Sequence, residues 1–466
     1  MNAEARQEGP VILGAGLAGT LLAIFLARRG HSVRLIERNP DLRRHTAPAG
    51  RSINLALAER GIHALKKAGV FDQVKELLIP MRGRMLHDPE GQLKLQPYSR
   101  NADEVIYSVS RSGLTATLLD AAEQTGKVEI LFNHSITGLD IGNSELTVTT
   151  GLLDGAQVLR ARPIIAADGA GSLVRRTLAE AGLIDASEEL LSHGYKELTI
   201  APAADGGFRM DPNALHIWPR GGFMLIALPN PDASFTVTLF MAYDAKPGFE
   251  QLDTRERVLA FFREEFPDAV PLIPGLAEEF FKNPTGILGT IRCRPWYAGD
   301  KALLIGDAAH AIVPFHGQGM NCAFEDCVVL DEMLATDNAL SEDLFARFSE
   351  SRKPNADAIA DMALDNYLEM RDRVNDPNFH LQKSLAWELE AKIPERFVPR
   401  YSMVMFRRIP YAVAQRRGAK QAALLKKLAH GAATLADIDM EHALQVVKDE
   451  LPVMDPDRLA DQALQT

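Results

Sequence analysis

Cysteine is scarce in this sequence: among its 466 residues there are only three, Cys293, Cys322 and Cys327. So small and odd a number cannot support a disulfide framework and is typical of a reducing compartment. The spacing of Cys322 and Cys327 matches no common metal motif, so we expect both to be packing residues.

Segments that direct a chain to or across a membrane are also lacking. The first residues, Met-Asn-Ala-Glu, do not begin a basic region followed by an apolar run, so no signal peptide is predicted. No stretch reaches about 18 uninterrupted apolar residues, so no transmembrane helix is predicted. These absences favour a cytoplasmic protein.

Positive charge is in deficit. Lys and Arg number 51 against 62 Asp and Glu, a formal net charge of −11, which disfavours nucleic acid as the main partner. Apolar residues make up 46% and charged residues 24%, the ordinary balance of a globular protein. The chain is too long for one simple core and predicts two or three domains.

Near its start the sequence contains a glycine-rich turn between an apolar strand and a helix. Val11 to Leu13 is apolar, and Gly14 to Gly19 reads Gly-Ala-Gly-Leu-Ala-Gly. Helix formers follow, and a second apolar strand ends at Glu37. This is the dinucleotide-binding pattern in its full context: the turn and the helix N-terminus receive the pyrophosphate, and the acid accepts hydrogen bonds from a ribose. The pattern does not distinguish FAD from NAD.

Two later strands end in a pair of Asp and Gly. Asp168-Gly169 is either an ordinary strand-ending turn or a second close approach of the backbone to the dinucleotide. Gly306-Asp307 precedes a glycine-bearing loop that enters a helix at about Asn321. Such a helix end would stabilise the negative charge of a reduced flavin. His310 and His316 lie in the same stretch, but no carboxylate or thiol stands at a matching spacing, so we expect no metal.

The middle and the end of the chain follow other patterns. From Leu191 to Met241, apolar runs alternate with turns, which predicts a mixed or antiparallel sheet in a separate layer. Residues 362–466 are predicted to be helical. Within them, Arg396 to Ala436 contains nine basic and no acidic residues. We interpret it as a solvated helix face with its leucines in the core; transient contact with an anionic membrane surface is the alternative.

Gly14 to Gly19, Asp168-Gly169 and Gly306-Asp307 together resemble the single-component FAD-dependent aromatic hydroxylases in order and spacing. Five further blocks are similar to the kynurenine 3-monooxygenase family: Arg51 to Gly61, Arg82 to Met85, His193 to Leu198, Asn213 to Pro219 and Pro399 to Val404. The resemblance implies FAD as cofactor, NADPH as co-substrate, and hydroxylation of L-kynurenine by O₂ to 3-hydroxykynurenine through a C4a-hydroperoxyflavin. No second fingerprint for NADPH is present.

The fold expected from this resemblance is α/β. A Rossmann-like FAD-binding domain would comprise residues 1–75, 102–190 and 286–370. It would be interleaved with a mixed β-sheet substrate-binding domain of residues 76–101 and 191–285. A C-terminal helical region would follow at 371–466. Eukaryotic members of the family end in a membrane anchor, and its absence here favours a soluble enzyme of the bacterial type.

The resemblance also implies site residues. The cofactor-binding residues are Gly14, Gly16, Leu17, Ala18, Gly19, Glu37, Arg38, Ala56, Arg111, Asp168, Asp307, Pro314, Gly317, Gly319, Met320 and Asn321. The substrate-binding residues are Arg84, Tyr98, Phe315, His316, Asn366 and Tyr401. Arg84 would bind the substrate carboxylate, although spacing alone favours a surface arginine in a hairpin. No catalytic base is assigned, because the amino group of kynurenine activates its own ring.

Three other readings are open. The first is an FAD-dependent hydroxylase of another aromatic acid. The second is a flavin halogenase or reductase on the same scaffold, although a Trp-x-Trp-x-Ile-Pro motif is missing. The third is a non-catalytic binding protein that reuses the fold, against which the intact Gly306-Asp307 loop speaks.

Overall fold

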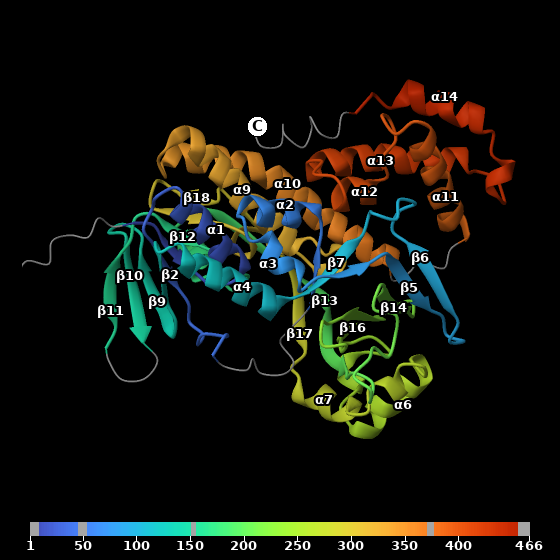
Figure 1. The fold of residues 1–466 in the computed structure, drawn as a ribbon, viewed down its shortest axis with the longest axis horizontal. Coiled ribbons are helices and arrows are strands. Elements are labelled where there is room, and N and C mark those ends of the chain that lie inside the picture. Colours follow the sequence, from blue (N-terminus) through green and yellow to red (C-terminus); the bar gives the residue numbers. More distant parts are fainter. Residues whose placement is uncertain (1–8, 45–53, 151–154, 371–376, 455–466) are drawn as a thin grey trace, which may run out of the picture. The chain divides into compact units, whose positions relative to one another are not determined.

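A computed structural model describes residues 9–44, 54–150, 155–370 and 377–454 (Figure 1). The chain forms two compact units. Unit 1 comprises residues 1–78, 109–190 and 289–360, and unit 2 comprises residues 79–108, 191–288 and 361–466. The α/β class is confirmed, whereas the predicted three-part division, with residues 371–466 as a part of their own, remains a prediction.

Unit 1 is built on a six-stranded sheet with the order β18-β19-β12-β1-β2-β8. Five neighbouring strands are parallel, and only the edge strand β18 is antiparallel. The strands are β1 (Val11–Leu13), β2 (Val33–Ile36), β8 (Val128–Leu131), β12 (Ile164–Ala166), β18 (Tyr297–Ala298) and β19 (Ala302–Leu304). Because they are parallel, the carboxyl ends of β19, β12, β1 and β2 lie at one edge, where α/β folds bind ligands.

Helices and a small sheet complete unit 1. The helices are α1 (Leu17–Arg28), α2 (Glu59–Lys67), α3 (Phe71–Lys75), α4 (Arg111–Gln124), α5 (Leu173–Glu180), α8 (Asp307–His310), η3 (Pro314–His316), α9 (Gly319–Asp337) and α10 (Glu342–Leu368), the last of which continues into unit 2. The extended segments are β3 (Asn54–Leu57), β9 (His134–Asp140), β10 (Glu145–Thr150) and β11 (Gln157–Arg160). Helix α1 is buried on almost every side, and Ser110 and Ser172 cap α4 and α5.

Unit 2 contains most of a seven-stranded sheet with the order β17-β13-β16-β15-β14-β5-β6. The strands are β5 (Gly83–His87), β6 (Leu93–Pro97), β13 (Asp185–Ile200), β14 (Leu215–Pro219), β15 (Met224–Pro229), β16 (Phe235–Ala242) and β17 (Gly286–Arg294). Strand β14 is parallel to β5 and antiparallel to β15, so the predicted mixed sheet is confirmed. The unit also contains β4 (Ile79–Met81), which pairs with β7 (Ile106–Ser110).

Helices α6 (Arg255–Glu265) and α7 (Leu276–Lys282), with η1 (Phe249–Gln251) and η2 (Val270–Leu272), enclose an aromatic core against this sheet (Figure 1). Trp218, Phe235 and Phe262 are among its fully buried side chains. Alternation along β16 places large apolar side chains on the face that the helices cover.

The C-terminal part of unit 2 is helical, as predicted, up to Glu450. It contains α11 (Pro377–Lys392), α12 (Arg400–Met405), α13 (Tyr411–Leu428), η5 (Leu435–Asp437) and α14 (Met440–Glu450); residues 455–466 lie outside the described part. Leu424 is buried in a core shared by α11, α13 and α14, and Leu425 and Leu428 pack against it. Leu368, by contrast, is 46% exposed.

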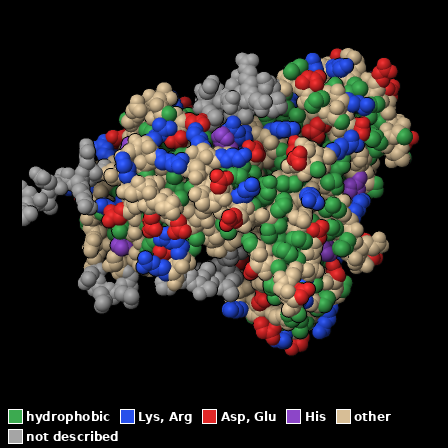
Figure 2. Space-filling view, viewed as in Figure 1, with side chains coloured by type: hydrophobic (Ala, Val, Ile, Leu, Met, Phe, Trp, Pro, Cys, Tyr) green, Lys and Arg blue, Asp and Glu red, His purple; other side chains and the backbone are tan. Residues whose placement is uncertain are grey.

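None of the described helices combines the length and the apolar character needed to cross a membrane. On the face shown in Figure 2, basic and acidic side chains are interspersed rather than gathered by sign. The solvated helix face predicted for Arg396 to Ala436 and the alternative of contact with a membrane surface are not distinguished by these observations.

A buried polar chain crosses the covered face of the unit 2 sheet. Asp268 Oδ2 accepts hydrogen bonds from Trp218 Nε1 at 2.8 Å and from His87 Nδ1 at 2.7 Å. His87 Nε2 lies 2.8 Å from His216 Nδ1, and His216 Nε2 lies 2.8 Å from the carbonyl oxygen of Asp211. Because that carbonyl can only accept, the neutral His216 ring donates through Nε2 and accepts from His87 through Nδ1. Burial lowers the pKa of His216 from 6.5 to about 4.

We expect His216 to make the free energy of unfolding depend on pH. In the unfolded chain it binds a proton near pH 6.5, but in the folded chain only near pH 4. Between these values the unfolded state binds more protons, so stability falls as pH falls, by up to about 1.4 kcal/mol per pH unit. Urea unfolding over this range should show a shallower pH dependence for His216→Gln than for the wild type. Equal pH slopes would contradict this expectation.

Candidate functional site

The motif loops of unit 1 meet at one edge of its parallel sheet. The glycine-rich turn follows β1, Glu37 follows β2, Asp168 follows β12 and Gly306 follows β19. These strands are immediate neighbours. Three stretches far apart in the sequence are thereby brought to the place where a dinucleotide binds in such sheets.

The three glycines of the first turn have different surroundings. Gly14 has φ +97°, and a Cβ there would lie 2.5 Å from the Ala167 carbonyl oxygen. A Cβ on Gly19 would lie 2.0 Å from the Gly14 carbonyl oxygen. A Cβ on Gly16 would meet no described atom within 4 Å. Gly14 and Gly19 are therefore required by the protein's own packing, whereas Gly16 borders open space that a ligand can fill.

The N-terminus of α1 faces this loop with its donors available. Gly16 is the N-cap residue, and no side chain caps the helix. The first-turn N–H groups and the helix dipole therefore suit a phosphate. Leu17 and Ala18 belong to this first turn.

Glu37 ties the glycine loop to the end of β2. Its Oε2 accepts from Ala15 N at 2.9 Å, and its Oε1 accepts from Asn39 N at 2.9 Å and Asn39 Nδ2 at 2.7 Å. A carboxylate has about four acceptor positions, so one remains for a ribose hydroxyl. The neighbouring Arg38 is exposed.

The Asp168 carboxyl group has one oxygen that is hydrogen-bonded and one buried oxygen that the described residues leave unsatisfied. Its Oδ2 accepts from Leu173 N at 2.9 Å, but within the described part of the chain its Oδ1 has no hydrogen-bond partner. Burial raises the pKa of this carboxyl group. A ligand that donates a hydrogen bond would remove the cost of this unsatisfied atom, about 1–3 kcal/mol.

Asn321, in the first turn of α9, joins the segment at Ala56 and Ala58 to the loop at Gly317. Its Oδ1 accepts from Ala58 N at 2.9 Å, and its Nδ2 donates to the carbonyl oxygens of Ala56 at 2.8 Å and Gly317 at 2.9 Å. Gly317 has φ +65°, and a Cβ there would lie 2.9 Å from the Ala56 Cβ. Three predicted cofactor residues thus contact one another.

The other predicted cofactor residues also lie in unit 1. Asp307 opens α8, Pro314 opens η3, Gly319 and Met320 open α9, and Arg111 is the first residue of α4. Their roles toward the cofactor remain predictions.

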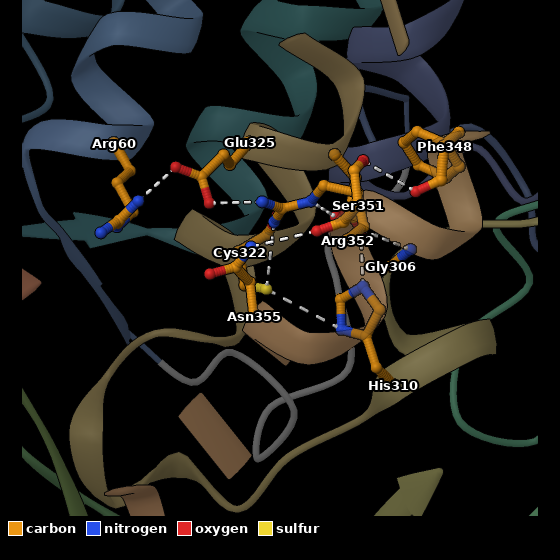
Figure 3. Close-up of polar contacts among 10 residues, drawn as sticks. Arg60, Gly306, His310, Cys322, Glu325, Phe348, Ser351, Arg352 and Asn355 are labelled. Carbon is orange, nitrogen blue, oxygen red and sulfur yellow. Dashed lines mark hydrogen bonds and ion pairs between the residues drawn. The ribbon is translucent and has the colours of Figure 1, made fainter. Parts of the chain in front are cut away.

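A buried polar cluster adjoins Gly306 (Figure 3). His310 Nε2 lies 2.5 Å from Asp326 Oδ2, and Cys322 Sγ lies 4.0 Å from His310 Nδ1. The potential ligand atoms of these three residues lie within 4.8 Å of one another, a proximity that sequence spacing did not reveal. Arg352 Nε lies 2.7 Å from Asp326 Oδ1. The positive charge of this guanidinium disfavours a metal cation beside the same carboxylate. The absence of a metal remains a prediction.

Four of the predicted substrate residues come together in unit 2. Arg84 on β5 is 7% exposed. Its Nη2 lies 3.5 Å from Asn366 Oδ1, and its guanidinium carbon lies 6.0 Å from the ring centre of Tyr98 and 5.6 Å from that of Tyr401. The two tyrosine rings stack with centroids 5.4 Å apart. The interpretation of Arg84 as a surface residue, which spacing alone favoured, is wrong.

The two tyrosines are hydrogen-bond donors at neutral pH. Burial raises the pKa of Tyr98 to about 12 and that of Tyr401 well above its usual range. Protonated phenol groups beside a guanidinium can donate hydrogen bonds to an anion that pairs with this cation.

Sequence reasoning missed three neighbours of Arg84. Glu369 Oε1 lies 3.6 Å from Arg84 Nη1; it stands three residues after Asn366, a helical spacing that could have indicated it. Gln96 is paired with Arg84 across the β5–β6 ladder, so both point to the same face, and within the described residues its buried Nε2 has no partner. Lys383 Nζ donates to the Pro97 carbonyl oxygen at 3.2 Å, and burial lowers its pKa to about 8; no local signal indicates it.

Phe315 and His316, also predicted to contact substrate, are buried in η3 of unit 1. Their roles remain predictions.

Comparison with known proteins identifies the family of the chain. The model of the FAD binding domain family matches residues 10–363. Kynurenine 3-monooxygenase of Myxococcus xanthus (strain DK1622) is 47% identical over 448 residues, 96% of each chain. That of Stenotrophomonas maltophilia (strain K279a) is 48% identical and covers 95% of this chain and 97% of its own.

Solved structures support the fold. The tetrameric form of 2-methyl-3-hydroxypyridine-5-carboxylic acid oxygenase has a TM-score of 0.65 at 21% identity and covers 80% of this chain and 95% of its own. P. aeruginosa PqsL in complex with 2-aminobenzoylacetate has a TM-score of 0.63 at 22% identity, with 78% and 97% covered. With the motif loops assembled at one sheet edge and relatives matching nearly the whole length, the chain belongs to the kynurenine 3-monooxygenase family of FAD-dependent aromatic monooxygenases.

Proposed function

We propose that this protein hydroxylates L-kynurenine to 3-hydroxykynurenine with FAD as cofactor and NADPH and O₂ as co-substrates. The observation that carries the proposal is the buried Arg84 beside Asn366, Tyr98 and Tyr401. This arrangement suits the amino-acid end of kynurenine, the compound that appears in the name of the relatives.

The residues at the edge of the unit 1 sheet fit FAD. Gly16 and the N-terminus of α1 would hold the pyrophosphate, Glu37 would accept from a ribose, and Asp168 Oδ1 would accept a hydrogen bond that the protein leaves unmade. Bound FAD would accept electrons from NADPH, react with O₂ and transfer one oxygen atom to the substrate. The chain supplies orientation and exclusion of water.

Arg84 binds the substrate carboxylate. A buried carboxylate requires a cationic partner, and a guanidinium matches its two oxygens better than an ammonium does. The hydroxyl groups of Tyr98 and Tyr401 and the amide of Asn366 add hydrogen bonds. The aromatic amino group of kynurenine activates the neighbouring ring carbon, so no protein base takes part in the oxygen transfer.

Product analysis tests the proposal directly. The purified yellow protein is incubated with NADPH, O₂ and either L-kynurenine or a phenolic acid. We expect 3-hydroxykynurenine, one oxygen atom heavier than its substrate, with NADPH consumed in equal amount. Formation of a hydroxylated phenolic acid without 3-hydroxykynurenine would support the alternative function, hydroxylation of another aromatic acid. A colourless, flavin-free protein would support a non-catalytic binding role.

A cytoplasmic location is part of the same proposal. Cys293, Cys322 and Cys327 are all free and buried, which suits a reducing compartment. Fractionation of the native cells, with activity assayed in each fraction, tests it, and activity outside the cytoplasmic fraction would contradict it.

A further inference from the structure

Helix α9 carries three polar side chains that each bind a different segment of unit 1. Asn321 bonds to the backbone of Ala56, Ala58 and Gly317. Glu325 forms an ion pair with Arg60 of α2, and Asp326 bonds to the backbone of Gly306. Asn321 and Glu325 are four positions apart and lie on the same side of the helix, and Asp326 is the next residue after Glu325. Helix α9 therefore binds the backbone of Ala56 and Gly317, two predicted cofactor residues, and that of Gly306, which precedes a third, Asp307.

Asp326 binds both ends of the turn that carries Asp307. Its Oδ2 accepts from Gly306 N at 3.2 Å, just before α8, and from His310 Nε2 at 2.5 Å, at the last residue of α8. Its Oδ1 accepts from Arg352 Nε at 2.7 Å. Asp326 itself is fully buried. The carboxylate therefore fixes the length and orientation of this single helical turn.

The contacts of Asp326 continue as a chain of alternating charge (Figure 3). Arg352 Nη1 lies 2.7 Å from Glu325 Oε2, and the other Glu325 oxygen is paired with Arg60. Burial opposes the charge on Asp326, but His310 and Arg352 outweigh it and lower the pKa of this carboxyl group. The chain thus joins α8, α9, α10 and α2 through ionised groups.

Packing alone does not account for such a chain. Burying ionised groups costs desolvation energy, and apolar side chains of similar volume usually stabilise a core equally well. What an ion chain adds is a fixed geometry, because each carboxylate oxygen accepts a hydrogen bond from a particular donor at a fixed position. Here that geometry fixes the position of the Gly306–His310 turn.

We propose that Asp326 is a positioning residue for FAD: it holds the Gly306–His310 turn in the conformation that receives the cofactor, without touching the cofactor itself. The inference rests on the FAD site of the proposed function but not on kynurenine. A binding experiment without substrate therefore tests it separately from the activity.

The same helix offers a matched control. Asp331 also lies on α9, is 6% exposed, and forms an ion pair with Arg29, the residue that follows α1; Arg29 Nε lies 2.5 Å from Asp331 Oδ1. Its partners, Arg29 after α1 and Lys67 at the end of α2, belong to none of the predicted cofactor loops. Loss of either carboxylate removes a buried ion pair from α9, but only Asp326 reaches the turn.

The test compares the apoproteins of Asp326→Asn and Asp331→Asn. Thermal unfolding measures stability, and titration with FAD, followed by flavin fluorescence, measures affinity. We expect the Kd for FAD to rise at least about tenfold in Asp326→Asn and to stay within about twofold in Asp331→Asn. The visible circular dichroism of the bound flavin should change in Asp326→Asn alone. Equal losses of affinity in both variants, or wild-type affinity in Asp326→Asn, would overturn the proposal.

A second variant covers the case in which Asp326→Asn does not fold. In His310→Gln the side-chain amide can still donate a hydrogen bond to Asp326, and Arg352 remains paired with Asp326. The positive charge of the His310 ring beside Asp326 is lost. We expect the Kd for FAD to rise about threefold or more, with the apoprotein folded by circular dichroism. Unchanged affinity and an unchanged flavin spectrum in folded His310→Gln would overturn the proposal equally.

Discussion

Replacement of Arg84 by methionine is expected to raise the KM for L-kynurenine at least about tenfold, while the FAD content stays normal. Tenfold corresponds to about 1.4 kcal/mol of lost binding, a low estimate for a buried carboxylate deprived of its cation. Methionine keeps the length and the apolar character of the arginine stem, so the packing against Tyr98 and Tyr401 is retained. Steady-state kinetics with flavin quantified by absorbance measures both quantities.

Three variants control this experiment. Tyr98→Phe and Tyr401→Phe should each raise KM less, because a neutral hydrogen bond contributes less than a paired charge. Arg100→Met removes a largely exposed arginine of the same unit, whose Nη2 lies 2.6 Å from Glu388 Oε1, and should leave KM unchanged. If Arg84→Met also left KM unchanged, the carboxylate would bind elsewhere, and Lys383 would be the next cation to replace.

Contiguous patterns predicted the fold well. The apolar run at Val11 to Leu13 is β1, and β5 and β6, joined through the turn at Gly91 with φ +80°, form the hairpin that spacing favoured around Arg84. In contrast, the first half of β13 (Asp185–Ile200) was not predicted. Most of its residues before His193 are exposed, so no apolar alternation marks them. Pairing with other strands, rather than burial, defines such segments.

The same contrast holds for the sites. The glycine-rich turn could be predicted because its sequence and geometry are both local. The burial of Arg84 could not be predicted from spacing, because its neighbours come from far along the chain: Asn366, on α10, is 282 positions away, and Tyr401, on α12, is further still. Likewise, His310 meets Asp326 only because α8 packs on α9. Long-range packing of this kind leaves no periodic signal in the sequence.

The substitution Gly16→Ala is expected to abolish most FAD binding while the apoprotein stays as stable as the wild type. Gly16 has φ −76° and ψ −170°, a conformation that alanine adopts freely. A Cβ there meets no described atom within 4 Å. The methyl group would instead occupy the space left for the pyrophosphate. We expect the Kd for FAD to rise at least about a hundredfold, equivalent to about 2.7 kcal/mol.

Two further glycines separate this effect from a loss of folding. In Gly19→Ala the new Cβ would lie 2.0 Å from the Gly14 carbonyl oxygen, so helix and strand must move apart, and both stability and FAD affinity should fall. In Gly222→Ala, in the turn between β14 and β15, the new Cβ meets no atom of the described residues within 4 Å, and neither quantity should change. Thermal unfolding of the three apoproteins and titration with FAD distinguish these cases. Equal FAD affinity of Gly16→Ala and Gly222→Ala would mean that the open space at Gly16 is not where the pyrophosphate binds.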